Sequence, residues 1–329
     1  PMSALYEPTP AVPEGTQELG DTPRGAATEP LGQPTKSGAL NKLRIYVMLT
    51  KPRVIELLLV TTLPSMILAE GGLPSLGLML SVLLGGALAA GGANTVNCYI
   101  ERDRDQIMKR THGRPLPMGE VSPKAALIFG LTLEVIAFIW LSLTANVLSA
   151  ALALSAMLFY IFVYTIWLKP RSPQNIVIGG AAGAVPALVG WAAVTGSLAI
   201  APWLLFVIIF LWTPPHFWAL AVRYRDDYAK AGIPMLPVVK GLKVAGQQIF
   251  IYSILVAIAS LSLQLTGTVG WIYTASALVL SSLFVVLAFR LMRGMTPESA
   301  IKFFMFSNTY LAILFAMVAV DVLLRNALG

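Results

Sequence analysis

Nine long apolar stretches limit what this chain can fold into. They cover residues 54–70, 76–99, 124–143, 146–167, 175–194, 201–221, 245–265, 269–290 and 301–323. A bilayer core about 30 Å thick is crossed by an α-helix of about 20 apolar residues. The composition agrees, because 57% of the residues are hydrophobic and only 12% are charged, against about 25% charged in soluble domains. We therefore expect an all-α integral membrane protein with nine transmembrane helices.

The basic residues are distributed unevenly between the connections. They precede the first stretch and gather in every second connection, whereas the connections near 71–75, 144–145, 195–200 and 266–268 contain no Lys or Arg. By the positive-inside rule the N-terminus is cytoplasmic and the C-terminus lies outside, as in a bacterial inner membrane. The net charge of +7 then reflects topology and attraction to anionic lipid of the bilayer. We expect no nucleic-acid partner, since no stacking motif accompanies the charge.

Two regions are expected along the chain. Residues 1–41 are rich in Pro, Gly, Thr and Glu and predict a disordered cytoplasmic tail. Residues 42–329 form the nine-helix membrane domain. The single cysteine, Cys98, excludes an intramolecular disulfide and a thiolate metal cluster. We interpret Cys98 as a small buried hydrophobe.

An acidic ridge begins at the end of the second apolar stretch. Asn97, Glu101 and Asp105 recur every four residues, so on an α-helix they share one face, whereas Asp103 points away from it. Carboxylates this close repel one another unless a cation lies between them, and oxygen ligands of this kind suit Mg²⁺. The alternative is a solvated helix end of mixed charge, since basic residues lie nearby at Arg102, Arg104, Lys109 and Arg110.

Two connections, 100–123 and 222–244, are long and dense in charge, and each pairs acids with arginines before a Pro-containing turn. A site with both Mg²⁺ and cationic side chains at a membrane face indicates a phosphate-bearing lipid. The metal ion would bridge diphosphate oxygens, and Arg and Lys would take the remaining charge. Lys51 and Arg53 open the first stretch on the same side. They could join this site, or they could simply anchor the helix at the interface.

The sixth stretch contains Pro214, Pro215 and His216 in succession. A proline pair is expected to interrupt the helical hydrogen bonds, which membrane proteins tolerate where the freed carbonyls find protein or a cavity. An intramembrane histidine indicates a metal or haem-iron ligand or an acid/base. The alternative is a packed histidine that hydrogen-bonds a freed backbone carbonyl.

Several segments together resemble the UbiA superfamily of intramembrane prenyltransferases, and within it the branch that farnesylates haem. The resemblance extends over most of residues 44–324 and is carried by Thr50–Val54, Asn97–Asp105, Met108–Pro117, Asn175–Ala184, Gly190–Gly196, Leu211–Ala219 and Asp227–Pro237. It implies nine helices around a central cavity, Mg²⁺ as cofactor, farnesyl diphosphate as donor and haem B as acceptor. The implied reaction joins the farnesyl group to a haem vinyl group with addition of water, which gives haem O. Candidate protein partners are haem A synthase and oxidase assembly factors.

The resemblance also assigns site residues. Its first Asp-rich motif falls on the acidic ridge, and its second falls on Asp226 and Asp227. Cys98, Glu101 and Arg223 stand where many family members have Asp. These departures favour the haem branch and leave the number of Mg²⁺ ions open.

The implied mechanism gives each residue a role. Asn97, Glu101 and Asp105, helped by Asp227, hold Mg²⁺ at the diphosphate, and the catalytic set also includes Arg110 and Arg114. The remaining residues are expected to bind substrate: Lys51 and Arg53 at the diphosphate, Arg223 and Asp226 in the second loop, Tyr99, Trp212 and Trp218 around the farnesyl cation, and His216 at haem, through iron or a propionate.

Two other functions remain open. One is a related prenyltransferase with an aromatic or quinone-precursor acceptor, against which His216 argues. The other is a transporter with a metal-binding mouth. A transporter should carry charges near the middle of several spans, whereas the acids within or near these stretches are few: Glu56, Glu70, Glu134 and Asp321.

Overall fold

The computed structural model describes residues 38–328. Most of the expected tail, residues 1–37, lies outside the described residues, and the first helix, α1 (Ala39–Leu49), begins three residues before the expected start of the membrane domain. Within residues 38–328, nine helical segments are long and apolar enough to cross a membrane. The prediction of an all-α protein with nine spans is therefore confirmed.

The nine spans follow one another along the chain with short connections. They are α2 (Pro52–Glu70), α3 (Leu76–Ile107), α4 (Pro123–Thr144), α5 (Val147–Leu158) continued by η1 (Phe159–Leu168), α6 (Asn175–Thr195), α7 (Ile200–Arg223), α10 (Gly241–Ser262) continued by η2 (Leu263–Thr266), α11 (Trp271–Arg293) and α12 (Pro297–Leu328). Two short helices, α8 (Arg225–Lys230) and α9 (Leu236–Val239), lie in the connection after α7.

Local sequence explains where several helices begin and end. The side chains of Ser75, Ser122 and Asn146 accept hydrogen bonds from backbone N–H groups three residues ahead, at the starts of α3, α4 and α5. Such caps satisfy N–H groups that have no partner inside the helix. α2 and α6 end at Gly71 and Gly196, whose φ angles of 69° and 66° favour glycine.

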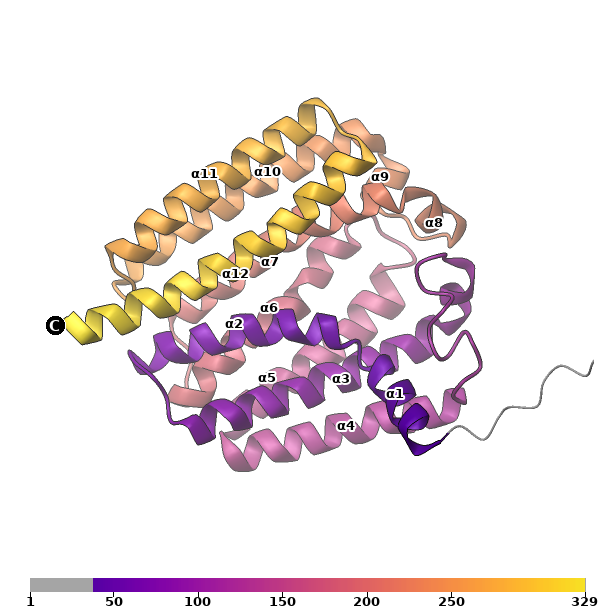
Figure 1. The fold of residues 1–329 in the computed structure, drawn as a ribbon, viewed down its shortest axis with the longest axis horizontal. Coiled ribbons are helices and arrows are strands. Elements are labelled where there is room, and N and C mark those ends of the chain that lie inside the picture. Colours follow the sequence, from indigo (N-terminus) through magenta and orange to yellow (C-terminus); the bar gives the residue numbers. More distant parts are fainter. Residues whose placement is uncertain (1–37, 329) are drawn as a thin grey trace, which may run out of the picture. The chain divides into compact units, whose positions relative to one another are not determined.

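The contacts between consecutive helices close a ring, and Figure 1 shows α12 lying between α11 and α2. Consecutive spans contact one another from α2 through to α12, and α12 returns to pack against both α2 and α7. Small residues permit close approach: a Cβ atom on Gly92 of α3 would lie 2.8 Å from the carbonyl oxygen of Gly130 in α4. Van der Waals packing through such residues is a main source of helix association in a bilayer.

Helix α7 keeps its helical conformation through Pro214 and Pro215, although neither proline has an N–H to donate to the carbonyl four residues earlier. Of the nine candidate spans, α7 is the most buried, and it packs between α6, α10 and α12. The hydroxyl of Thr213 donates to the carbonyl of Ile209 at 2.8 Å, inside the same helix. Neighbouring helices thus hold the proline-containing turn in helical geometry.

The second half of the fourth span is a π-helix, η1, which the apolar pattern of its residues does not predict. At its end the N–H of Lys169 donates to the carbonyl of Tyr164, five residues earlier, at 2.8 Å. π-helices are rare in proteins, and those that occur often lie at functional sites. The widened turn rotates Tyr160, Tyr164 and Lys169 relative to the α5 residues before them.

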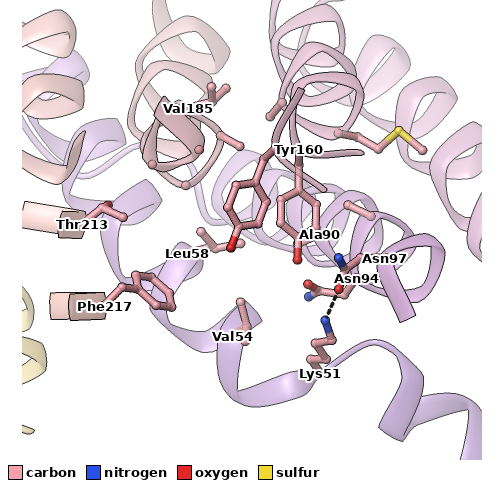
Figure 2. A pocket seen from close by; sticks show the side chains of 18 of the residues that line it. Lys51, Val54, Leu58, Ala90, Asn94, Asn97, Tyr160, Val185, Thr213 and Phe217 are labelled. Atoms are coloured by element: carbon pink, nitrogen blue, oxygen red, sulfur yellow. Dashed lines mark hydrogen bonds between the residues drawn. The ribbon is translucent and has the colours of Figure 1, made fainter. Parts of the chain in front are cut away.

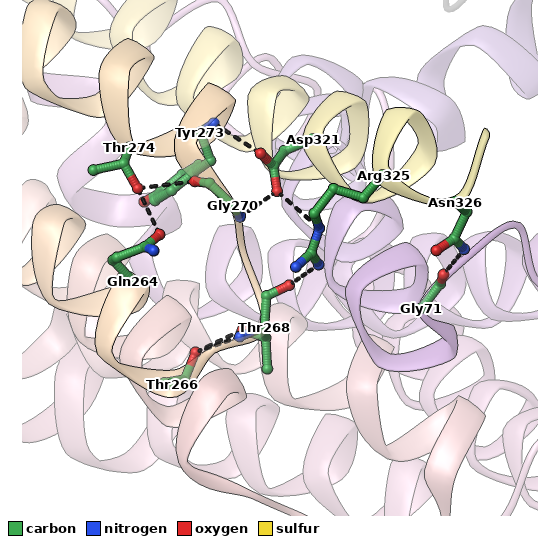
Figure 3. Close-up of polar contacts among 10 residues, drawn as sticks. All are labelled: Gly71, Gln264, Thr266, Thr268, Gly270, Tyr273, Thr274, Asp321, Arg325 and Asn326. Atoms are coloured by element: carbon green, nitrogen blue, oxygen red, sulfur yellow. Dashed lines mark hydrogen bonds and ion pairs between the residues drawn. The ribbon is translucent and has the colours of Figure 1, made fainter. Parts of the chain in front are cut away.

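At the end of the bundle opposite the acidic ridge, a polar cluster joins α12 to its neighbours (Figure 3). The buried carboxylate of Asp321 accepts from the backbone N–H groups of Gly270, at 2.5 Å, and Tyr273, at 3.1 Å, where α11 begins. Arg325 lies 3.5 Å from Asp321 and donates to the carbonyl of Thr268, and Asn326 donates to the carbonyl of Gly71. The cluster attaches the last helix to α11 and to the end of α2.

Candidate active site

The acidic ridge lies on one continuous helix, because α3 extends to Ile107. Asn97, Glu101 and Asp105 are 1%, 5% and 3% exposed, respectively. Asp103 points to the opposite side, where its side chain is 80% exposed. The four-residue spacing thus places one amide and two carboxylates on a single buried face.

Each residue of the acidic ridge contacts one basic side chain from a different segment. Lys51 Nζ donates to Asn97 Oδ1 at 2.6 Å, and Arg114 donates to Asp105 Oδ2 at 2.7 Å. Lys169, at the end of η1, forms an ion pair with Glu101. The three partners come from the link before α2, the connection after α3 and the connection after η1. Folding therefore gathers a compact cluster in which two carboxylates are paired with two bases, while Lys51 faces the neutral amide of Asn97.

The surroundings shift the pKa values of the three basic groups differently. Burial alone would lower the pKa of Lys169 and of Arg114, but the carboxylates of Glu101 and Asp105 outweigh it, and both pKa values are raised. Lys51 faces the neutral amide of Asn97, so burial dominates and its pKa is lowered. An incoming anion would stabilise the charged form of Lys51 more than that of Lys169 or Arg114, because the Lys51 ammonium group contacts no carboxylate.

The link that carries Lys51 has an unusual backbone. Lys51 has φ 54°, in the left-handed region that residues other than glycine rarely adopt. Its neighbour Thr50 is held from both sides: its hydroxyl donates to the carbonyl of Val47, and its own carbonyl accepts from Asn94 of α3. The bend directs Lys51 toward α3 instead of along the helix axis, and such backbone strain is common at functional sites.

A cavity of about 350 Å³ begins at this charged cluster. The six clustered side chains line one end of the cavity together with Arg104 and Arg110, and residues of α2, α3, α5, α6 and α7 form an apolar body. Figure 2 shows the Lys51–Asn97 hydrogen bond at one end, with Thr213 and Phe217 of α7 toward the other. A cavity with a charged end and an apolar body suits a ligand that has an anionic head and a hydrocarbon tail.

The aromatic residues expected in the cavity are only partly there. Trp212 lines it, and its indole N–H donates to the carbonyl of Ser307 at 2.9 Å. Tyr99 instead packs below the guanidinium of Arg102, 4.8 Å from the ring centre. Trp218 is 1% exposed and packs edge-on against Tyr252. Neither of these two lines the cavity, because their side chains lie on other faces of α3 and α7.

His216 also lies outside the cavity lining. Its Nδ1 atom is 2.6 Å from the hydroxyl of Ser307, and its ring stacks between Trp212 and Phe304 at centroid distances of 4.2 and 4.3 Å. The hydrogen-bond partner is thus a side chain of α12, not the freed backbone carbonyl considered above. Trp212 and Phe217, which both touch the imidazole ring, line the cavity. His216 lies behind that wall.

The second acidic motif is placed differently from the acidic ridge. Asp227 is buried, Asp226 and Arg223 are exposed, and none of the three lines the cavity, whereas Tyr228 does. Arg53 is exposed and does not line it either. In the part of the chain that the structure describes, no three His, Cys, Asp or Glu side chains are grouped closely enough to hold a metal ion.

The donor set of the acidic ridge is nevertheless of the kind that binds Mg²⁺. Two carboxylates and one amide oxygen face one end of the cavity, and each already holds a cationic nitrogen. Mg²⁺ is usually bound through one or two carboxylates together with water and substrate phosphates, not by a complete protein cage. The residues present therefore fit a Mg²⁺ ion that enters with a diphosphate.

Comparison with known proteins agrees with this geometry. The model of the UbiA prenyltransferase family matches residues 58–310. The chain belongs to the UbiA prenyltransferase family. Protoheme IX farnesyltransferase of Clavibacter sepedonicus is 52% identical over 290 residues, which cover 87% of this chain and 95% of that protein. The enzyme of the same name from Salinispora tropica is 49% identical over 311 residues, with 90% and 97% covered.

Solved structures of low sequence identity share the UbiA fold. A digeranylgeranylglyceryl phosphate synthase superimposes with a TM-score of 0.71 at 19% identity, covering 86% of this chain and 99% of that one. A UbiA homologue from Archaeoglobus fulgidus, solved with GPP and Mg²⁺, superimposes with a TM-score of 0.59 at 20% identity, covering 83% and 99%. These matches show that the chain shares its fold with these proteins.

Several cavity residues of this UbiA-family chain were not singled out by the sequence analysis. They are Lys169, Tyr160, Tyr164, Phe217 and Tyr228. Lys169 follows an apolar stretch on the same side as the acidic ridge. A lysine at this position is explained by membrane topology as well as by a binding site, so the sequence does not distinguish the two. Tyr160 and Tyr164 lie in a run without charged residues, so no periodicity marks the face toward the cavity, and Tyr228 lies in the charged connection after α7.

Proposed function

We propose that this protein transfers the farnesyl group of farnesyl diphosphate to a vinyl group of haem B, with addition of water, and so produces haem O. The observation that carries the proposal is the 52% identity to a protoheme IX farnesyltransferase over nearly the full length of both chains. The cavity supports it, because its charged end suits a diphosphate and its apolar body suits a farnesyl chain.

The acidic ridge is the proposed metal site. Asn97, Glu101 and Asp105 would hold Mg²⁺, which when bound supplies positive charge to the diphosphate leaving group. The contribution of Asp227 stays a prediction, since this carboxylate is buried away from the cavity lining.

The basic side chains of the cluster have a second role in this proposal. Once Mg²⁺ neutralises the two carboxylates, Lys169 and Arg114 would be released from them and, together with Lys51, could turn to the diphosphate oxygens. Arg110 lines the same end of the cavity and adds a further guanidinium. Guanidinium groups match phosphate oxygens in pairs, whereas ammonium groups act as point charges. The cluster would thus exchange internal ion pairs for contacts with the donor.

The chemistry at the farnesyl group follows from the apolar body. The bond between the first farnesyl carbon and the diphosphate oxygen breaks, and the electron pair leaves with the diphosphate. The ring faces of Trp212, Tyr160 and Phe217, which line the cavity, can stabilise the allylic cation. The vinyl group then attacks this cation, and water captures the resulting carbocation at haem and releases a proton. Exclusion of bulk water from the apolar body protects the first cation from hydrolysis.

The placement in the membrane is also a proposal. The acidic ridge lies at the same end of the bundle as the connections rich in Lys and Arg, so the positive-inside rule puts the site at the cytoplasmic face of a bacterial inner membrane. Haem A synthase and oxidase assembly factors remain the expected protein partners. No feature of the site calls for nucleic acid.

Purified protein in lipid nanodiscs tests the function directly. We expect incubation with haem B, farnesyl diphosphate and Mg²⁺ to give a product whose mass exceeds that of haem B by one farnesyl and one hydroxyl group, and EDTA to abolish it. Parallel reactions should replace haem with 4-hydroxybenzoate. Prenylation of that acid without any haem product would show the alternative prenyltransferase activity and overturn the proposal.

A further inference from the structure

Thr165, in the middle of η1, is fully buried and connects the π-helix to the acidic ridge. Its hydroxyl oxygen accepts a hydrogen bond from Asn97 Nδ2 at 3.1 Å. The same hydroxyl donates to the backbone carbonyl of Tyr160, five residues earlier, at 2.8 Å. Neither Thr165 nor Tyr160 belongs to the acidic ridge, yet the two bonds link it to the π-helical backbone.

The two hydrogen bonds of Thr165 have a fixed direction. A hydroxyl group carries one proton, and a backbone carbonyl can only accept. The proton of Thr165 is therefore committed to Tyr160, and toward Asn97 the hydroxyl can offer only a lone pair. Consequently the amide of Asn97 must present its NH₂ group to Thr165. Its oxygen is then turned to the other side.

The contact on the other side agrees independently. Lys51 Nζ, which can only donate, lies 2.6 Å from Asn97 Oδ1. That oxygen lies in the wall of the cavity (Figure 2), where Asn97 is a lining residue. Two partners of opposite character thus select the same orientation of the amide.

The π-helical turn makes this arrangement available. In an α-helix a threonine hydroxyl bonds the carbonyl three or four residues earlier, whereas in η1 it reaches the fifth. The same turn places Tyr160 and Tyr164 in the cavity wall with their rings stacked 5.6 Å apart. The backbone deviation thus serves both the amide and the aromatic wall.

We propose that Thr165 is a positioning residue that fixes the orientation of the Asn97 amide, so that its oxygen and not its NH₂ group is offered to the metal ion. The proposal rests on the proposed function, in which the acidic ridge binds Mg²⁺. An amide that presents its NH₂ group offers no ligand to a divalent cation, which binds through oxygen. Partners of metal ligands commonly contribute 10- to 100-fold to metal affinity.

The test compares Thr165→Val, which keeps the shape and removes the hydroxyl, with Thr165→Ser, which keeps the hydroxyl. Mn²⁺ serves as the probe, and its binding is followed by electron paramagnetic resonance with a thiodiphosphate analogue of the donor. We expect Thr165→Val to weaken Mn²⁺ binding at least about 10-fold and Thr165→Ser to stay within about 2-fold of wild type. Haem affinity, from a Soret titration, should be unchanged in both variants, and this titration reports whether Thr165→Val is folded.

A second background separates orientation from general packing. In Asn97→Asp both side-chain atoms are oxygens, so no orientation has to be selected. There we expect Thr165→Val to cause less than about a third of the loss that it causes beside Asn97. An equal loss in both backgrounds, an unchanged Mn²⁺ affinity in Thr165→Val, or an equal loss in Thr165→Ser would each overturn the proposal. Failure of the wild type to farnesylate haem, with the Thr165–Asn97 coupling intact, would instead refute the proposed function.

Discussion

The three basic partners of the acidic ridge are not equivalent. Lys169 and Arg114 each face a carboxylate, whereas Lys51 faces the neutral amide of Asn97. A charge that has lost water without gaining a counter-ion is costly. Lys51 should therefore respond most strongly to the arrival of an anionic substrate, and the two carboxylates should respond most strongly to the arrival of a cation.

The carboxylates of the acidic ridge should be indispensable. We expect Glu101→Gln and Asp105→Asn to reduce turnover to below about a tenth of the wild-type rate, which corresponds to about 1.4 kcal/mol in the barrier, because each removes an anionic ligand. Asp103→Asn is the matched control, since Asp103 is on the exposed side of the same helix. Product formation is followed by mass spectrometry, and membrane expression is measured alongside. Retention of more than a tenth of the rate in either variant would contradict the metal assignment.

Lys51 should give the enzyme an alkaline limit. Burial lowers the pKa of Lys51 below the ordinary value of 10.5, so raising the pH removes its charge earlier than for an exposed lysine. The value of kcat/KM for farnesyl diphosphate reports the ionisation of the free enzyme. As the pH rises, we expect this value to begin to fall at a pH lower than 10.5. Lys51→Arg keeps its charge and should move the fall to higher pH. An identical alkaline limb in wild type and Lys51→Arg would assign it to another group.

His216 should act through packing. Because the imidazole lies behind Trp212 and hydrogen-bonds Ser307, we expect His216→Ala to bind haem with an unchanged Soret band. The lost ring leaves a void between Trp212 and Phe304, and a lowered thermal unfolding temperature should result. Phe217, which lines the cavity beside it, gives the comparison: Phe217→Ala should weaken haem or donor binding with less effect on unfolding. A changed Soret band in His216→Ala would instead support His216 as an axial ligand of haem iron.

At the scale of the helices, the features predicted from the sequence were those with a simple period or length. Apolar runs predicted the nine spans, and the four-residue spacing predicted the shared face of Asn97, Glu101 and Asp105. The run from Phe159 to Leu168 is apolar or aromatic apart from Thr165, so its pattern could not distinguish an α-helix from a π-helix or show which side chains face inward. Residue type alone likewise favoured Tyr99 and Trp218, and both lie away from the cavity.

The π-helix also explains a glycine on the neighbouring helix. A Cβ atom on Gly179 of α6 would lie 2.2 Å from Cδ2 of Tyr164, whose ring lies 5.7 Å from Lys169 Nζ. We expect Gly179→Ala to displace Tyr164 and to reduce turnover at least about 10-fold, or about 1.4 kcal/mol. Gly77→Ala is the control, because nothing lies within 4 Å of a Cβ atom there. Recovery of activity in Gly179→Ala combined with Tyr164→Leu would confirm the collision, whereas full activity of Gly179→Ala alone would exclude it.

At the scale of the whole helical domain, the candidate active site and the contacts that hold α12 in place lie at opposite ends of the helices. The charged cluster occupies one end of the ring, and the cluster around Asp321 occupies the other (Figure 3). Helix α12 contributes Leu311 to the cavity and packs against α2 and α7. Attachment of α12 at its far end should therefore stabilise the ring without entering the reaction.

Asp321 separates these two contributions. Its carboxylate is fully buried, accepts hydrogen bonds from two backbone N–H groups at the start of α11 and forms an ion pair with Arg325. A buried N–H group that loses its acceptor costs about 1–3 kcal/mol, and Asp321→Ala takes the acceptor from two of them. We expect Asp321→Ala to lower the thermal unfolding temperature in nanodiscs strongly, while kcat per folded molecule below that temperature stays near wild type. Arg325→Ala should have a smaller effect on unfolding, since the Arg325 side chain is 44% exposed and pairs near water are weak. A fall in kcat without a fall in unfolding temperature would show instead that this end of the bundle takes part in the catalytic cycle.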